Sequence, residues 1–404
     1  MNKRKILVFA HVPPPHHGQS VMVQILLEGL RADPRFEVHH VDARVSDDMG
    51  DIGSFRPQKF IRLFKCILQA WWIRLRHGRM AFYYVPAPAK RSAILRDWVV
   101  MALCRPLFPE LILHWHAYGL GEWAAAGKEC QRRLTRLALG KADLAIVLNN
   151  YNKRDAEVFE PTRIEVVPNG IADLFPDYDV TLAPKRKARA AALAVLGSVA
   201  GNESRVTGQE CDNPETVRFL FLGHLMESKG VLVAIEATKL ANEELRQSNA
   251  PWRAELTLAG SFASEAEKAR VLEAIKTASQ SAGDNGSCVT LAGFMDSGQK
   301  KSALEKADAL VFPTFYENEA QPLVLFEAMC AGLPVVTTSW RGIAEPLPHG
   351  YPLIVEPRSA GSLAKALTDL GALTSTEGLR ANYASEYKMQ LFAPRMADTL
   401  LKVY

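Results

Sequence analysis

Two glutamates, Glu319 and Glu327, are the residues whose type and spacing most readily indicate chemistry. They lie within a stretch that predicts a strand reaching Phe312, a loop, a helix from Pro322 to Ala331 and a second strand ending at Thr337. In such a β–α–β unit ligands bind where the strand ends and the helix begins, because free backbone N–H groups and the helix dipole lie there. Two carboxylates beside an anion-binding backbone predict a ligand with hydroxyls as well as phosphate. Two solvated surface residues remain the alternative.

The sequence EAQPLVLFEAMCAGLPVV, which begins at Glu319, resembles the E-x7-E segment of the retaining glycosyltransferases of family 4 (glycosyl transferases group 1). The resemblance implies that Glu319 contacts the hydroxyls of the donor sugar and that Glu327 contacts the ribose hydroxyls of the nucleotide. This chain departs from the family at Pro322, where glycine is usual, so one backbone N–H is missing. Phosphate contacts then fall to the N–H groups of Leu323 and Val324.

A second group of candidate residues follows the predicted strand at 217–223. The family pattern here is G-R-x4-K-G, in which arginine and lysine neutralise the donor diphosphate. Lys229 and Gly230 match, but His224 replaces the arginine, and a neutral imidazole cannot hold a phosphate bidentately as guanidinium does. Protonation of His224, substitution by another cation such as Arg341, or weaker catalysis remain open.

Two further candidates lie in the first half of the chain. Gly18 ends a proline-rich loop before the helix predicted at 20–30, where a glycine lets the backbone approach a ligand closely. His116 ends the strand predicted at 111–116. The resemblance implies that Gly18 is the glycine of the family's first loop and that His116, with Gly119, contacts the donor sugar. A glycine kept for loop geometry and a structural histidine are the alternatives.

The chain of 404 residues, 48% hydrophobic and 23% charged, is long enough for two globular domains. The resemblance implies an α/β, GT-B fold of two Rossmann-like domains that face each other across a cleft. We expect an acceptor-binding domain at 1–175, a linker or insertion with at most one short helix at 176–216, and a nucleotide-sugar-binding domain at 217–390. A helix at about 391–404 should pack back on the first domain. The sequence VVPNGI resembles the family's boundary motif between the domains, and its Asn169-Gly170 pair predicts a turn with positive φ.

A basic, aromatic segment at about 56–79 has a composition of its own. Between Ile52 and Arg96 there is no acidic residue, and FIRLFKCILQAWWIRLRHGR within it has a helical pattern. Such a helix can lie on an anionic membrane, where each basic group adds about 1 kcal/mol. The alternative is that its apolar face packs on the sheet while the cations are solvated. We expect a cytoplasmic protein bound peripherally to the inner face of the cell membrane.

Composition and spacing also weigh against several functions. The six cysteines form no C-x-x-C pair, which argues against a cysteine zinc site and a disulfide framework. A net charge of +4 is too small to indicate nucleic acid as a partner. The apolar run in MNKRKILVFAHVPPP is too short for a secretory signal, and no stretch of about 20 apolar residues occurs elsewhere.

The resemblance implies transfer of a sugar, with retention, from a UDP- or GDP-linked donor to a glycan or lipid-linked acceptor in surface polysaccharide or glycolipid biosynthesis. It implies His116, Lys229 and Glu319 as the catalytic residues. No metal and no cofactor besides the nucleotide sugar are expected, because cations and helix N-termini stabilise the departing diphosphate. A nucleotide-sugar 2-epimerase of the same fold and a non-catalytic subunit that binds sugar nucleotides remain as alternatives; His224 and Pro322 favour the latter.

Overall fold

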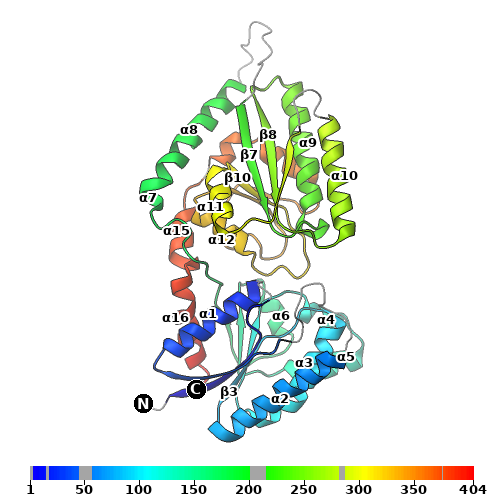
Figure 1. Cartoon of the computed structure of the whole chain (residues 1–404), viewed down its shortest axis with the longest axis vertical. Helices are drawn as coiled ribbons and strands as arrows, with labels where there is room; N and C mark the ends of the chain where they lie inside the picture. The colour runs from blue at the N-terminus through cyan, green and yellow to red at the C-terminus, as the bar shows by residue number, and fades with distance from the viewer. Residues whose placement is uncertain (1–2, 15–17, 45–56, 201–214, 282–286, 375) are drawn as a thin grey trace. The chain divides into compact units, whose positions relative to one another are not determined.

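The chain forms two compact units, each built around a parallel sheet (Figure 1). The computed structural model describes residues 3–14, 18–44, 57–200, 215–281, 287–374 and 376–404. Unit 1 comprises Met1–Gly170, Glu317–Gln321 and Tyr387–Tyr404, and unit 2 comprises Ile171–Tyr316 and Pro322–Glu386. The expected α/β class is confirmed.

Unit 1 contains a six-stranded sheet with the order β2-β1-β3-β4-β5-β6. Its strands are β1 (Arg4–Phe9), β2 (Phe36–Val41), β3 (Ala81–Tyr84), β4 (Leu111–Trp115), β5 (Leu144–Val147) and β6 (Ile164–Val166). The central strands are apolar runs buried on both faces, as helix-covered parallel strands must be. The strand order reverses between β1 and β3, so the topological switch point lies there.

Helices cover both faces of this sheet (Figure 1). One face is covered by α1 (Gly18–Ala32) and α16 (Met389–Leu401), whose Met22, Leu26, Phe392 and Met396 share a core. The other face packs against α2 (Pro57–His77), α3 (Arg91–Cys104) and α5 (Glu129–Leu139). The remaining unit 1 helices are η2 (Arg105–Leu107), α4 (Leu120–Ala126) and α6 (Lys153–Glu157).

The contact between α1 and α16 depends on Gly29. A Cβ atom at Gly29 would lie 2.3 Å from the Cβ of Ala393, closer than packed carbons allow. Although alanine normally stabilises a helix interior relative to glycine, we expect Gly29→Ala to destabilise unit 1 by about 1–3 kcal/mol through overpacking. Thermal unfolding measures this loss, and the double variant with Ala393→Gly should recover most of it. Equal stability of Gly29→Ala and wild type would contradict the packing of α16 on α1.

Unit 2 contains the second six-stranded parallel sheet, with the order β12-β11-β10-β7-β8-β9. Its strands are β7 (Glu215–Leu222), β8 (Trp252–Ala259), β9 (Val289–Gly293), β10 (Ala309–Phe312), β11 (Val335–Thr338) and β12 (Ile354–Val355). Its helices include η3 (Glu227–Lys229), α9 (Val231–Gln247), α10 (Glu265–Ser281), α11 (Ser297–Lys306), α12 (Leu323–Cys330), α13 (Ala360–Thr368), α14 (Leu370–Leu373) and α15 (Leu379–Asn382). The switch point lies between β7 and β10.

Two helices occupy much of the stretch that the sequence predicted to be a linker. These are α7 (Tyr178–Thr181) and α8 (Ala183–Ala200), where at most one short helix was expected. The alanine-rich sequence of α8 favours a helix. Two arginines of α8 bind it to the rest of unit 2. Arg189 donates to the carboxylate of Asp308 at 2.8 Å, and Arg186 donates to the carbonyl of Ala307 at 2.5 Å. Residues 201–214 lie outside the described part of the chain.

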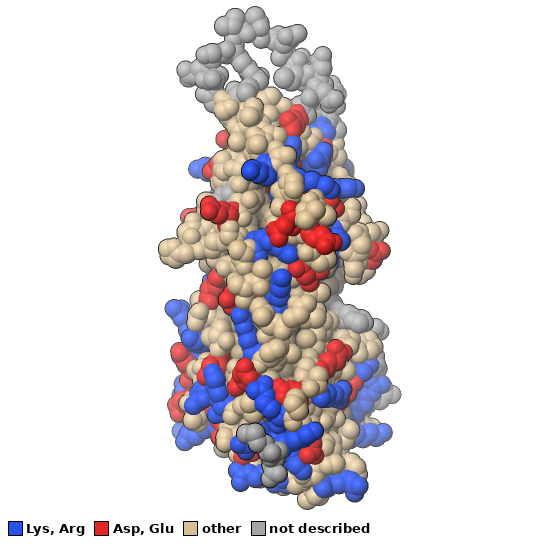
Figure 2. All heavy atoms as spheres, turned by 90° about the vertical axis from the view of Figure 1, so that its left-hand side faces the viewer, with Lys and Arg blue, Asp and Glu red and all other residues tan. Residues whose placement is uncertain are grey.

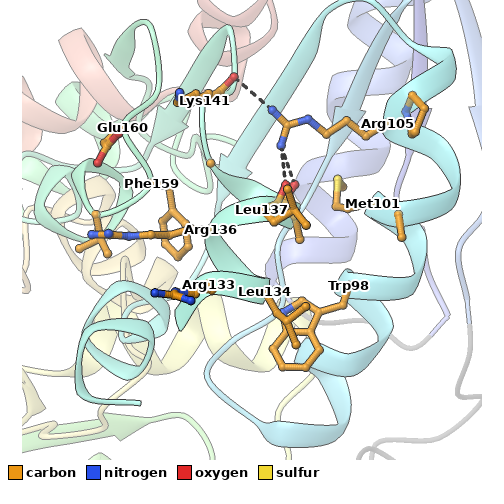
Figure 3. A pocket seen from close by; sticks show the side chains of 15 residues that line it. Trp98, Met101, Arg105, Arg133, Leu134, Arg136, Leu137, Lys141, Phe159 and Glu160 are labelled. Atoms are coloured by element: carbon orange, nitrogen blue, oxygen red, sulfur yellow. Dashed lines mark hydrogen bonds between the residues drawn. The ribbon is translucent and has the colours of Figure 1, made fainter. Parts of the chain in front are cut away.

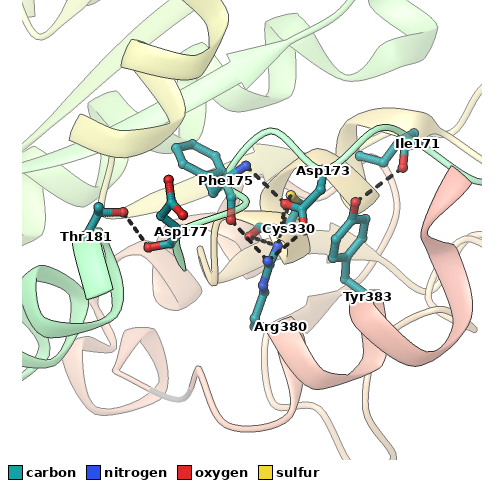
Figure 4. A network of polar contacts seen from close by, with 8 residues as sticks. All are labelled: Ile171, Asp173, Phe175, Asp177, Thr181, Cys330, Arg380 and Tyr383. Atoms are coloured by element: carbon teal, nitrogen blue, oxygen red, sulfur yellow. Dashed lines mark hydrogen bonds and ion pairs between the residues drawn. The ribbon is translucent and has the colours of Figure 1, made fainter. Parts of the chain in front are cut away.

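A polar network holds the first residues of unit 2 (Figure 4). The guanidinium of Arg380 pairs with the carboxylate of Asp173 at 2.8 Å and donates to the carbonyl of Phe175. The preceding Gly170 does not have the positive φ that its Asn-Gly dipeptide predicted. Glycine fits there for a different reason, since a Cβ would lie 2.9 Å from the carbonyl oxygen of Lys388.

Candidate functional site

The loops that follow β7 and β10 meet at the switch point of unit 2. The β7 loop contains His224 and η3, and the β10 loop leads through Pro313 towards α12. The N–H group of Phe315 donates to the carbonyl of Ser228 at 2.8 Å, which joins the two loops. Ligands of open parallel sheets bind at this position, outside the carboxyl ends of the strands that flank the reversal.

Gly230 allows the close approach of these loops. Its φ is +84°, and a Cβ atom there would lie 2.2 Å from the carbonyl oxygen of Pro313. Glycine therefore allows both the left-handed backbone conformation and the direct contact with the end of β10. The result is a fixed turn that holds Lys229 beside β10.

Two aromatic rings position the ammonium of Lys229. It lies 5.5 Å from the ring centroid of Phe312 and 5.2 Å from that of Tyr316. Such cation–π contacts restrain a flexible lysine side chain while the charge stays available to an anion. His224 lies at the start of the same loop and is exposed.

The open face of α12 contains three of the predicted site residues. Leu323, Val324 and Glu327 are half-buried, whereas the other five residues of the helix are buried. Residues at positions i, i+1 and i+4 lie on one side of a helix. Pro322, at the N-cap, has an extended backbone and no N–H to offer. The helix thus begins at Leu323, which is where the sequence placed the phosphate contacts.

Glu327 has one oxygen engaged and one available. Its Oε1 accepts a hydrogen bond from the ammonium of Lys300, on α11, at 2.5 Å. Its Oε2 is buried and has no hydrogen-bond partner within the described residues. Burial raises the pKa of Glu327 above its ordinary value, against the opposing effect of Lys300. A buried oxygen without a donor costs about 1–3 kcal/mol, which a ligand hydroxyl can recover.

Two arginines add positive charge at the same edge of the sheet. The guanidinium of Arg358 lies 4.7 Å from the ring centroid of Phe315, and that of Arg341 lies 5.5 Å from the ring of Trp340. The indole N–H of Trp340 donates to the carbonyl of Tyr316 at 3.1 Å, which connects this loop to the β10 loop. Arg341 is recognisable in the sequence as a candidate cation, whereas Arg358 is not, because the two-residue strand before it is too short to show a pattern.

Glu319 belongs to a loop that docks on unit 1. Glu317–Gln321 is joined to segments that follow β4, β5 and β6 by one backbone hydrogen bond, from the Tyr118 N–H to the carbonyl of Asn318 (3.4 Å), and by four that involve side chains. These four run from Asn318 to the carbonyl of Tyr118 (2.8 Å), from Asn149 to the carbonyl of Ala320 (2.9 Å), from Gln321 to the carbonyl of Leu148 (3.2 Å) and from the Asn169 N–H to Gln321 (2.8 Å). Glu319 therefore lies at the carboxyl edge of the unit 1 sheet.

His116 and Gly18 also lie in unit 1. His116 directly follows β4 and is half-buried, and its ring packs 4.1 Å from that of His114. His114 is fully buried, accepts or donates a short hydrogen bond with the Tyr83 hydroxyl, and has a pKa well below the ordinary value because of burial. His114 is thus a core residue. Gly18 is exposed and begins α1; residues 15–17 lie outside the described part of the chain.

A hollow of about 1060 Å³ on unit 1 contains none of these residues (Figure 3). It is lined by α3, η2, α5 and the turn at 158–160, with Trp98, Leu134 and Leu137 among the apolar side chains. Lys141 and Glu160, on its rim, precede β5 and β6. The hollow is therefore near the amino ends of these strands, at the opposite edge from His116 and Glu319.

Charge is mixed on the side of each unit that Figure 2 shows. Lysine and arginine are interspersed with aspartate and glutamate among the described residues of both units there. None of the described helices is long and apolar enough to cross a membrane.

Comparisons with known proteins agree with this architecture. Two solved structures match over almost the whole chain: sucrose-phosphate synthase of Thermosynechococcus elongatus (TM-score 0.68, 18% identity, 99% of both chains) and HepE of Anabaena in complex with UDP and glucose (TM-score 0.63, 16% identity, 99% of this chain and 100% of that one). The fold is GT-B. The GT-B architecture expected from the sequence is thereby confirmed.

The sequence matches concentrate in unit 2. Residues 216–372 match the family model described as Glycosyl transferases group 1. The chain is 30% identical over 196 residues to the amylovoran biosynthesis glycosyltransferase AmsK of Erwinia amylovora, covering 46% of this chain and 45% of that protein. It is 28% identical over 194 residues to a glycogen synthase of Mycobacterium tuberculosis, covering 45% and 42%. The match thus spans less than half the length of each relative.

Proposed function

We propose that this protein is a retaining glycosyltransferase of family 4 that uses a UDP- or GDP-linked sugar. The observation that carries the proposal is the switch point of unit 2, where a positioned lysine and a buried glutamate oxygen occupy one sheet edge. A nucleotide-diphosphate sugar has the matching groups, a diphosphate and a set of hydroxyls. The match of residues 216–372 to Glycosyl transferases group 1 supports the same reading.

Each candidate residue has a role in this proposal. Glu327 accepts hydrogen bonds from the ribose hydroxyls, and the N–H groups of Leu323 and Val324 bind the diphosphate at the start of α12. Lys229 stabilises the negative charge that develops on the departing nucleotide, which is the largest electrostatic demand of the reaction. These assignments rest on unit 2 alone.

Two arginines compensate for the departure at position 224. His224 is exposed, whereas Arg341 and Arg358 lie on aromatic rings beside the β10 loop. Guanidinium binds phosphate bidentately and stays charged at any working pH. We propose that these arginines, with Lys229, supply the positive charge that the family draws from arginine and lysine, so that no metal is needed.

Unit 1 supplies the residues that meet the sugar and the acceptor in this proposal. His116 and Glu319 lie at the carboxyl edge of its sheet and orient the donor sugar. Attack then occurs on the face from which the nucleotide departs, and the leaving phosphate takes the proton of the acceptor hydroxyl. This sequence of events is carried over from the family by analogy.

Product analysis distinguishes the proposal from its rivals. NMR spectra of the protein with single UDP- or GDP-linked sugars, with and without a glycan acceptor, follow the anomeric and C2 configurations. A transferase forms an acceptor-dependent product with the anomeric configuration of the donor. A 2-epimerase converts the donor without an acceptor, and a binding subunit leaves it unchanged; either result would overturn the proposal.

We further propose that the acceptor is presented at a membrane that α2 contacts. This helix has two apolar faces: Leu63, Ile67 and Ala70 pack on the sheet, and a second row is exposed. The exposed row comprises Phe60, Ile61, Phe64, Leu68, Trp72 and Leu75, with Trp72 60% and Leu75 80% exposed. Packing on the sheet, the alternative weighed from the sequence, therefore accounts for only one of the two faces.

Neighbouring helices also have exposed apolar side chains. Leu95 and Val99 on α3, Leu107 on η2, and Leu134 and Leu137 on α5 are exposed. Hydrogen bonds from Trp71 to the carbonyl of Leu103 and from Arg74 to that of Leu107 hold α2 against α3 and η2. Exposed apolar rows flanked by basic residues are typical of helices that bind anionic membrane surfaces. The similarity to AmsK, an amylovoran biosynthesis glycosyltransferase, supports an acceptor in glycan biosynthesis.

Vesicle co-sedimentation tests this surface. The triple variant Phe64→Ser, Leu68→Ser, Trp72→Ser should lose most binding to anionic vesicles, because three exposed apolar side chains each contribute roughly 1–3 kcal/mol when they enter the bilayer interface. The control, Leu272→Ser with Phe294→Ser, removes exposed apolar side chains from unit 2 and should bind like wild type. Equal sedimentation of wild type with neutral and anionic vesicles would exclude an electrostatic contribution to membrane binding. Wild-type binding by the triple variant would show that α2 is not the membrane-binding surface.

A further inference from the structure

We propose that Glu37, His39 and His77 form a binding site for a divalent transition metal, best suited to Zn²⁺, on unit 1. Glu37 and His39 lie on one side of β2, since alternate residues of a strand share a face, and His77 is the last residue of α2. No residue assigned above to the donor or the acceptor takes part. The cysteine spacing argued against a cysteine zinc site, and this site has no cysteine.

The distances between the three ligand atoms fit a small ion. His39 Nε2 lies 3.0 Å and His77 Nδ1 lies 3.8 Å from Glu37 Oε1, and all three atoms lie within 4.8 Å of one another. Zinc bonds of about 2.0–2.2 Å in tetrahedral geometry place neighbouring ligand atoms about 3.3–3.5 Å apart. The observed separations lie on either side of that value, so small side-chain movements complete the geometry. Two imidazoles and a carboxylate are a ligand set that Zn²⁺ accepts, with its fourth position left to water.

Imidazoles bind metal in the neutral form and a carboxylate binds it in the ionised form. The rings of His39 and His77 pack with centroids 4.2 Å apart, a separation at which two positive charges repel strongly. The ammonium of Lys5 lies 3.5 Å from Glu37 Oε2.

Lys5 also shapes the site. Its ammonium lies 3.5 Å from Oε2 of Glu37 and donates to the carbonyl of His77 at 2.9 Å. Oε1 faces the two imidazoles, and its hydrogen bond with His39 Nε2 would be replaced by bonds to a metal ion. The site is at the carboxyl end of α2, where the helix dipole favours a cation. A bound ion would join the end of α2 to the edge strand β2. It would thereby fix the helix that has the exposed apolar row.

Calorimetric titration of the full-length, chelator-treated protein with Zn²⁺ tests the site. Wild type should bind one equivalent that is absent from the double variant His39→Ala, His77→Ala, with each single variant weakened at least about tenfold. Glu37→Gln keeps the size of the side chain and should also weaken binding, which covers the case that a histidine variant folds poorly. The control His349→Ala removes an exposed histidine of unit 2 and should match wild type.

Tryptophan fluorescence gives an independent readout. The ring of Trp72 lies 6.5 Å from that of His77, so Zn²⁺ should change the emission of wild type but not of Trp72→Phe, which still binds the ion. If wild type binds no zinc, or if the double variant binds it equally, the ion has no site at these residues and the proposal fails. Equal binding by the double variant would show an adventitious ion only, held elsewhere, for instance by cysteine.

Discussion

Replacing Lys229 with alanine should lower the turnover number of glycosyl transfer by roughly 10²–10³-fold, the loss typical when one group that stabilises transition-state charge is removed. The lysine is held on Phe312 and Tyr316 at the switch point, so its charge is in place before the reaction begins. Because the charge on the leaving diphosphate grows in the transition state, turnover should fall more than donor affinity does. Release of nucleotide diphosphate at saturating donor measures the turnover number.

Two variants control this experiment. Lys239→Ala removes a lysine of α9 that pairs with Glu236 at 3.1 Å, and it should leave turnover unchanged. Lys229→Arg keeps the charge and the aromatic contacts, so it should retain much of the activity. Wild-type turnover in Lys229→Ala would show that Lys229 has no part in stabilising the leaving group.

Gly230→Ala should destabilise unit 2 by about 3 kcal/mol or more and also abolish donor binding. The added Cβ would lie 2.2 Å from the carbonyl oxygen of Pro313, and a backbone atom cannot move aside without displacing β10 or the Lys229 turn. Thermal unfolding reports the loss of stability, and calorimetry with the donor reports the loss of binding.

Gly350→Ala is the matched control for that substitution. Gly350 has a φ of +74°, close to the +84° of Gly230, but a Cβ there would meet no atom within 4 Å. It therefore incurs only the cost of a left-handed alanine, about 1–2 kcal/mol. The difference between the two variants isolates the contact with Pro313. Equal destabilisation, with donor binding intact in Gly230→Ala, would contradict the role of this contact.

The sequence could predict the elements that local pattern determines. The apolar run of β10, the turn residues after it and the short helix α12 lie within a residue or two of the positions expected from 311–336. The same holds for β4, expected at 111–116, and for α1, expected at 20–30. In these cases the period of apolar residues and the positions of glycine and proline suffice.

Tertiary contacts account for what the sequence could not predict. Nothing in the spacing connects Lys300 with Glu327, since their pairing depends on how α11 and α12 pack. The amides of Asn318 and Gln321 look like ordinary loop residues until their partners on unit 1 are known. The docking of α8 through Arg186 likewise has no local signal, because its partners are backbone carbonyls.

The second apolar face of α2 was also hidden in the sequence. A helical pattern with apolar residues on most sides predicts burial, and it cannot tell which side meets the sheet. The structure buries Ile67 and Ala70 and leaves Phe64 and Trp72 exposed. Because α2 has two opposed apolar faces, the segment at 56–79 contains more apolar and aromatic residues than one buried face requires.

The most direct test of the central claim is a thermal-shift screen of nucleotide-diphosphate sugars against wild type and Glu327→Gln. A donor at a hundredfold excess over its Kd should stabilise wild-type unit 2 by about 2.7 kcal/mol, roughly 5 °C or more, with little or no shift in the variant. Glu236→Gln, which alters an exposed glutamate of α9, should respond like wild type. If one donor shifts wild type and Glu236→Gln but not Glu327→Gln, the donor lies at α12 as proposed. If no nucleotide sugar shifts wild type, or if Glu327→Gln responds equally, the donor site is not where this account places it.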